Sequence, residues 1–168
     1  MNRRDILGCA LAAGFSMTAT AEARALGSLA RPAAPLPLPG NGRIKVAFAI
    51  SNGANVIDLA GPWETFQDMT LPNGDAAFEL CTMAETTQIV ETTGGMRIEP
   101  TYSFDALPFW PNVIVVGAQS NGSETFMTLL RDAQGKVDLT MSVCTGAFKL
   151  AQSGILDGKS ATTHHDFY

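Results

Sequence analysis

The sequence predicts an α/β fold in which a parallel β-sheet is covered by helices on both faces. The apolar runs at 44–50, 113–116 and 137–143 are nearly continuous, as in strands that are buried on both sides. Segments with helical spacing separate these runs. The last run leads into a turn that carries Cys144 and then into a helix, which is the arrangement of a nucleophile elbow.

The predicted sheet begins at 44–50, where only Lys45 interrupts the apolar run. We expect a helix over 58–69 with Pro62 near its start, because proline is favoured in the first turn. Glu64 on this helix is predicted to be a solvated charge. Apolar side chains recur at helical spacing and predict the stripe that faces the core: Trp63, Phe66 and Met69.

The remaining elements alternate along the chain. A strand at 78–83 is predicted to place Cys81 in the core, and 89–98 is predicted to form a hairpin. After the strand at 113–116, Ser123 is expected to cap a helix that runs to about Arg131. The strand at 137–143 and a helix that ends at Gly154 complete the series.

The first 25 residues are predicted to be an export signal. Arg3 and Arg4 precede an apolar and small-residue stretch at 6–17, and the small residues at 21–25 suit signal peptidase. The paired arginines favour twin-arginine export to the periplasm, and a general secretory signal is the alternative. Residues 26–42 are rich in proline and are predicted to be a linker, so the folded domain is expected to span 43–168.

Composition and charge argue against some classes of partner. The chain has 168 residues and a net charge of −5 without a Lys/Arg cluster, which argues against nucleic-acid binding. Nothing between 43 and 168 is long and apolar enough to span a bilayer, so no stable membrane anchor is expected. Cys81 and Cys144 are expected to be free thiols, because one is predicted inside a strand and the other at a strand end.

Cys144 carries the strongest chemical signal. An elbow lifts the sulfur out of the sheet to the start of a helix, where unpaired N–H groups and the helix dipole favour a thiolate. The alternative is a small buried residue at a strand end. Ligands bind at the carboxyl ends of parallel strands, and Gly117 and the loop after Ile50 are predicted at the same edge.

Three segments, 58–62, 142–146 and 154–164, occur in an order typical of a known family. They resemble the ThiJ/PfpI branch of the class I glutamine amidotransferase-like superfamily, and within it the isonitrile hydratases and the sensor domains of AraC-type regulators. The resemblance runs from about Ile44 to the end of the chain. It implies a flavodoxin-like α/β sandwich that forms a homodimer and carries a nucleophilic cysteine, and no cofactor is expected.

The resemblance also implies roles for single residues. Cys144 would attack a small isonitrile-like substrate to give a thioimidate, with Asp58 as its acid/base partner and Thr145 as an orienting hydroxyl. For Asp58, a helix cap is the alternative. Backbone N–H groups near Gly117 and Thr145 would stabilise developing charge. The residues expected to bind the substrate or an anion are Gly117, Ala118, Gly146 and His164.

The sequence also departs from the family pattern. Ala118 stands where hydratases tend to have glycine, which puts the anion-stabilising loop in doubt. His165 replaces a wall aromatic, and Thr145 stands where protease-like relatives have histidine, which argues against a Cys–His dyad. Family members continue beyond the block that ends at His164, so the domain is expected to be incomplete at its C-terminus.

His164 and His165 are expected on an extended segment, where adjacent side chains point to opposite faces. A pocket-wall or structural role is therefore predicted, and no metal site.

Three functional hypotheses remain open. The first is an exported hydratase or hydrolase that produces an N-substituted formamide, and the second is a sensing domain in which Cys144 binds a ligand or is oxidised. The third is a truncated, inactive remnant. A regulator is disfavoured, because the sequence has an export signal and no helix-turn-helix segment.

Overall fold

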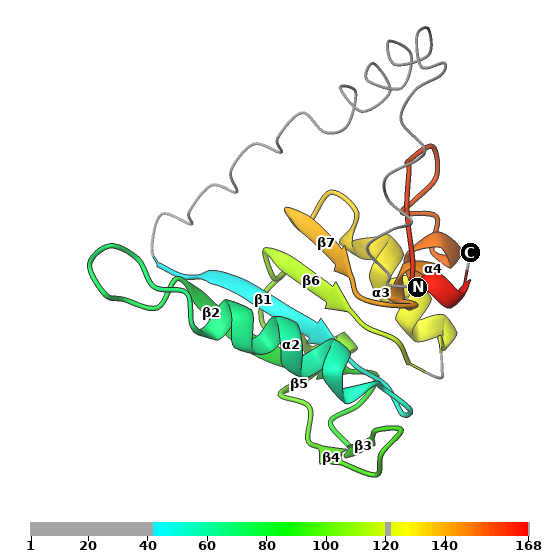
Figure 1. Cartoon of the computed structure of the whole chain (residues 1–168), viewed down its shortest axis with the longest axis horizontal. Helices are drawn as coiled ribbons and strands as arrows, with labels where there is room; N and C mark the ends of the chain where they lie inside the picture. The colour runs from blue at the N-terminus through cyan, green and yellow to red at the C-terminus, as the bar shows by residue number, and fades with distance from the viewer. Residues whose placement is uncertain (1–41, 120–121, 168) are drawn as a thin grey trace, which may run out of the picture. The chain divides into compact units, whose positions relative to one another are not determined.

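The computed structural model describes residues 42–119 and 122–167 (Figure 1). The predicted signal at 1–25, and the predicted linker at 26–42 except for Gly42, lie outside these residues. Within the described ranges, no helix has the length and apolar character needed to cross a membrane.

Five strands form one sheet in the order β5-β2-β1-β6-β7, and every neighbouring pair is parallel. The predicted parallel sheet is therefore confirmed. β1 lies at its centre, and the chain changes direction across the sheet between β1 and β6. The strands are β1 (Ile44–Ala49), β2 (Phe78–Ala84), β5 (Tyr102–Ser103), β6 (Val113–Val116) and β7 (Leu139–Ser142).

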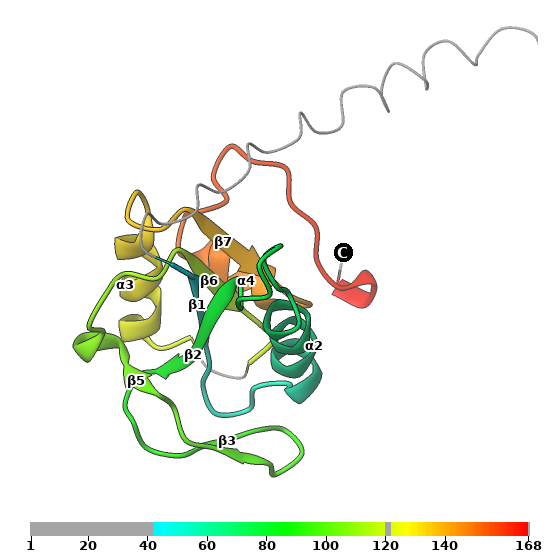
Figure 2. The same cartoon turned by 90° about the vertical axis from the view of Figure 1, so that its left-hand side faces the viewer.

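Helices lie on both faces of this sheet (Figure 2). On one face, α3 (Glu124–Ala133) and α4 (Gly146–Gln152) bury apolar side chains against alternate residues of β1, β2 and β6. On the other face lies α2 (Val56–Gln67), where Trp63 and Phe66 pack on Phe48 of β1 with ring centroids 5.1 and 6.3 Å apart. This is the α/β sandwich that the sequence predicts. Its flavodoxin-like topology is confirmed as well.

The prediction for α2 is wrong at its start. The helix begins at Val56, so Pro62 lies in its interior instead of its first turn. Proline has no N–H, so it cannot donate to the carbonyl of Asp58 four residues earlier. Packing of the aromatic stripe against β1 and β2 outweighs this cost and extends the helix through the proline.

The strand predicted at 137–143 begins too early, because β7 starts only at Leu139. The backbone N–H of Val137 donates to the carbonyl of Ala133 at the end of α3, so this residue still belongs to the turn. Pairing with β6 begins at Leu139. β7 is the last strand of the sheet, and its first side chain, Leu139, is 44% exposed.

The other predicted elements are confirmed, with two additions. Ser123 caps α3 by accepting a hydrogen bond from the N–H of Phe126 at 3.2 Å. The hairpin consists of β3 (Val90–Glu91) and β4 (Arg97–Ile98), which form a separate antiparallel pair. The sequence patterns do not predict the two-residue strand β5 or the 3-10 turn η1 (Phe104–Ala106) that follows it in the chain.

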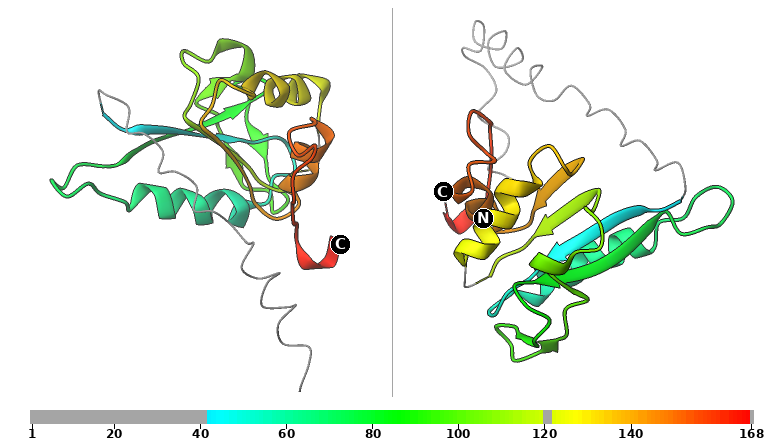
Figure 3. Two further views of the ribbon diagram at one scale, coloured as in Figure 1. Left: turned by 90° about the horizontal axis from the view of Figure 1, so that it is seen from above. Right: turned by 180° about the vertical axis from the view of Figure 1, so that it is seen from behind.

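The segment after α4 loops away from the sheet and returns, so that a second 3-10 turn, η2 (His165–Phe167), lies beside α4 (Figure 3). The rings of Phe167 and Phe148 meet edge to face with centroids 6.5 Å apart. This return brings the two histidines of the chain back to the edge of the sheet at which β7 ends.

Candidate active site

Cys144 lies on the predicted elbow between β7 and α4. Its φ of 55° makes it the one non-glycine residue with positive φ in the part of the chain that the structure describes. A left-handed conformation costs an L-residue about 1–2 kcal/mol, so the surroundings must hold it. The N–H of Val143, just before it, donates to the carbonyl of Val116 at 2.9 Å and anchors the turn to β6.

Gly146 allows the elbow to pack directly on β6. A Cβ at this position would lie 2.0 Å from the carbonyl oxygen of Val116, a distance that no side chain can tolerate. Its N–H donates to the carbonyl of Val143 at 2.9 Å, so it is not available for an anion. The geometry therefore gives Gly146 a packing role in place of the anion-binding role that the sequence suggests.

Asp58 is almost fully buried, with 5% of its surface exposed. Its Oδ2 accepts a hydrogen bond from the backbone N–H of Ala118, just beyond β6, at 2.8 Å. The N-cap position of α2 belongs to Asn55, so the alternative in which Asp58 caps the helix is wrong. Gly117 makes this approach possible, because a Cβ there would lie 2.8 Å from the Cβ of Asp58.

Cys144 and Asp58 line the same open pocket, which has a volume of about 610 Å³. His164 lies in its wall, as predicted. Several other lining residues were not singled out from the sequence: Asn55, Ile57, Ser142, Thr162 and Thr163. Their common signal is position. Asn55 and Ile57 lie at the start of α2, Ser142 is the last residue of β7 before the elbow, and the two threonines belong to the 154–164 block.

The other predicted site residues lie outside this pocket. Gly117 and Ala118 line a much smaller cleft of about 10 Å³, which Asp58 also lines. Ala118 keeps a negative φ, so its position does not require glycine, and its N–H is already bound to Asp58. Thr145 occupies the N-cap position of α4, but its side chain does not cap the helix.

Gln119 also lines the small cleft, and sequence reasoning overlooked it. Both polar atoms of its side-chain amide are buried without a hydrogen-bond partner among the described residues.

The 154–164 block contacts the elbow through a side chain. The hydroxyl of Thr163 donates to the backbone carbonyl of Cys144 at 3.1 Å. This bond holds the peptide group between Cys144 and Thr145, so a residue 19 positions downstream helps to fix the strained turn.

The prediction for the two histidines is wrong in its geometry. His165 begins η2 and His164 directly precedes it, so the two rings do not point to opposite faces but lie beside each other, with centroids 4.2 Å apart and planes tilted by 34°. Both line the pocket that contains Cys144.

Cys81 and Cys144 are both free thiols, as predicted. Cys81 is buried in β2, and burial, reinforced by the charge of Glu79 and opposed by that of Lys45, raises the pKa of its thiol to about 11. A buried neutral thiol is a packing residue, which leaves Cys144 as the candidate nucleophile of the two.

The model of the DJ-1/PfpI family matches residues 44–167, which include every element of the fold and the whole pocket. The chain belongs to the DJ-1/PfpI family. Among members of known structure, it is similar to a ThiJ/PfpI family protein from Pseudomonas syringae, with a TM-score of 0.60, 23% identity and coverage of 79% of this chain and 56% of that one. Schizosaccharomyces pombe DJ-1 aligns with a TM-score of 0.56 at 15% identity over 73% of this chain and 69% of that one.

Two curated relatives of this DJ-1/PfpI chain have named functions. It is 25% identical over 129 residues to isonitrile hydratase of Pseudomonas putida, which is 74% of this chain and 54% of that protein. It is 26% identical over 122 residues, or 71% of its length, to the HTH-type transcriptional regulator GbdR of Pseudomonas aeruginosa, of which it covers 33%. The chain therefore spans about half the length of the hydratase and a third of the regulator.

Proposed function

We propose that this protein is a cysteine-dependent hydratase that converts a small isonitrile-like substrate to an N-substituted formamide. The observation that carries the proposal is the shared pocket, in which a cysteine on a strained elbow and a buried carboxylate line one cavity. The similarity to isonitrile hydratase of Pseudomonas putida supports the choice of substrate class.

The proposed first half-reaction forms a carbon–sulfur bond. Asp58 takes the proton of the Cys144 thiol, and the thiolate adds to the terminal carbon of R–N≡C. Asp58 then returns that proton to the same carbon, which gives the thioimidate R–N=CH–S–Cys. A carboxylate suits this shuttle because it can accept and donate a proton in turn.

The second half-reaction consumes water. Asp58 takes a proton from a water molecule whose oxygen bonds to the thioimidate carbon, and the proton then passes to the nitrogen as the carbon–sulfur bond breaks. As the carbonyl forms, the second proton of the water molecule leaves the new oxygen and returns through Asp58 to the sulfur. The products are R–NH–CHO and the Cys144 thiol, so the sum is one isonitrile plus one water. The Ala118 N–H donates to Oδ2 and holds the carboxyl group in place between transfers.

Formamide production from an aryl isonitrile, followed by chromatography, tests this proposal. Cys144→Ala should abolish turnover, and Asp58→Asn should lower it by about 10²–10⁴-fold, the usual contribution of a general acid–base group. The asparagine side chain keeps an oxygen for the Ala118 N–H, so the fold should be retained. Glu64→Gln is the matched control on the exposed face of the same helix and should leave the rate unchanged.

Two results would count against the proposal. A protein without turnover, in which peroxide converts Cys144 to a sulfenic acid, would favour the sensing hypothesis. Full activity in Asp58→Asn would remove the carboxylate from the mechanism.

Export to the periplasm and assembly as a homodimer are further parts of the proposal. Replacing both Arg3 and Arg4 with lysine should block export if the twin-arginine route is used, and should have no effect if the general secretory route is used. Light scattering on the purified protein should give about twice the mass of one chain, and the mass of a single chain would contradict the dimer.

A further inference from the structure

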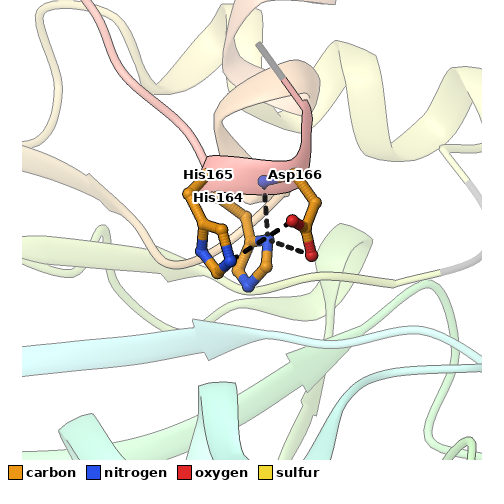
Figure 4. A group of neighbouring side chains, drawn as sticks. All are labelled: His164, His165 and Asp166. Carbon is orange, nitrogen blue, oxygen red and sulfur yellow. Dashed lines mark hydrogen bonds and ion pairs between the residues drawn. The ribbon is translucent and has the colours of Figure 1, made fainter.

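Three side chains of the types that can bind a metal ion meet at the start of η2, next to the candidate active site. The ligand atoms of His164, His165 and Asp166 all lie within 4.8 Å of one another. Asp166 lies 3.2 Å from Nε2 of His165 through Oδ1, and 3.8 Å from Nδ1 of His164 through Oδ2. Figure 4 shows the three side chains on the same side of the turn, with the carboxylate facing both rings.

The donor set and its spacing suit a divalent transition metal. Two imidazoles and one carboxylate are the ligand types that Zn²⁺ and Ni²⁺ accept, whereas Mg²⁺ and Ca²⁺ prefer oxygen alone. Tetrahedral bonds of about 2.0–2.1 Å place neighbouring ligand atoms about 3.3 Å apart. The separations of 3.2 and 3.8 Å are close to this value, and all three ligand atoms lie within 4.8 Å of one another, so side-chain rotations that draw them together would complete the geometry.

The backbone of η2 already orients one of these ligands. The N–H of Asp166 donates to Nδ1 of His164 at 3.3 Å, so that nitrogen presents its lone pair toward the aspartate. A metal ion would replace this long hydrogen bond with a stronger contact. Phe167 fixes the turn from the other end, because its ring packs edge to face on both Phe148 and His164.

We propose that His164, His165 and Asp166 form a binding site for a divalent transition-metal ion in the wall of the Cys144 pocket. Both histidines line that pocket, so a bound ion would add positive charge to the cavity that holds the thiol. Three protein ligands leave a coordination position open for water or for a ligand in the pocket. The side chains of His165 and Asp166 are 75% and 68% exposed, so an ion can enter from solvent.

Isothermal titration of Zn²⁺ into the untagged full-length chain tests the site. Cys9→Ser and Cys144→Ser define the parent background, because thiols bind zinc themselves, and a polyhistidine tag must be absent. We expect one ion per chain. His165→Gln and Asp166→Asn should each weaken binding at least tenfold, the loss that even indirect changes around a zinc site produce.

Asp157→Asn is the matched control, since it removes an exposed carboxylate from the same C-terminal segment and should leave the affinity unchanged. The chain contains only two histidines, so its imidazole NMR signals report on this site alone. Both sets should shift together on addition of Zn²⁺. Circular dichroism checks that each variant is folded.

Three results would overturn the proposal. The parent could bind no zinc at millimolar concentration, or it could bind zinc without movement of the imidazole signals. Alternatively, His165→Gln and Asp166→Asn could bind as tightly as the parent.

Discussion

Replacement of Gly146 by alanine tests how the elbow is built. The added Cβ would lie 2.0 Å from the carbonyl oxygen of Val116, about 1.4 Å inside the 3.4 Å at which ordinary contact begins. The obstacle is the backbone of a buried strand and not a flexible side chain, so α4 and the elbow would have to move away from β6.

The expected cost follows from two contributions. Overpacking a core costs about 1–3 kcal/mol, and a clash with backbone belongs at the upper end of that range. The same Val116 carbonyl accepts the N–H of Val143 at 2.9 Å, and lengthening that bond costs about 1 kcal/mol more. We therefore expect Gly146→Ala to lower the free energy of unfolding by about 3–4 kcal/mol, a large part of the stability of an ordinary domain.

Urea unfolding followed by circular dichroism measures this change, and Gly61→Ala provides the control. Gly61 lies in the interior of α2, nothing lies within 4 Å of the Cβ that alanine would add, and its φ is not positive. Alanine there should stabilise the protein by up to about 1 kcal/mol, because it is the better helix former. A loss of less than about 1 kcal/mol in Gly146→Ala, with an unaltered rate of Cys144 alkylation, would refute this account of the elbow.

Four further predictions concern the elbow and the cysteines. The free energy of unfolding of Cys144→Gly, measured with urea, should be about 1 kcal/mol higher than that of Cys144→Ala, because glycine accepts the φ of 55° without strain. Equal stability would mean that the turn relaxes. Thr163→Val should destabilise the protein by about 1 kcal/mol in the same assay, since it leaves the Cys144 carbonyl without its donor; no change would show that water replaces the hydroxyl. In a Cys9→Ser background at pH 8, a thiol reagent should modify Cys144 quickly and Cys81 only after unfolding, because Cys81 stays protonated until the pH approaches its raised pKa of about 11. Because that pKa is raised from 9.0 in the folded state, the contribution of Cys81 to stability should be complete below pH 9 and lost as the pH rises toward 11. Rapid labelling of both thiols in the folded protein would contradict this assignment.

Sequence reasoning worked best where one short-range signal decides the structure. The apolar run Val113–Val116 matches β6 at both ends, because four consecutive β-branched residues suit a strand that is buried on both faces. The elbow at Cys144 and the cap at Ser123 were predictable for the same reason, since each depends on a few consecutive residues.

Sequence reasoning failed where distant residues decide. The role of Asp58 depends on the N–H of Ala118, 60 positions later, and no periodicity connects the two. The start of α2 is predicted too late because the preference of Pro62 for a first turn is a local signal, whereas the packing of Trp63 on Phe48 is not visible in the sequence. The histidines were misplaced because a 3-10 turn of three residues has no sequence period long enough to detect.

The close contact between Gly117 and Asp58 has a consequence for the search for similar sites. The carboxylate reaches its position because the neighbouring residue has no side chain, and the elbow meets β6 because Gly146 has none either. Two positions without functional groups therefore shape this catalytic candidate as much as the thiol and the acid do. A search template that compares only the reactive side chains would accept a protein with a Cβ at either position, although its backbone segments could not come this close. A template that also requires glycine at these two positions would reject it.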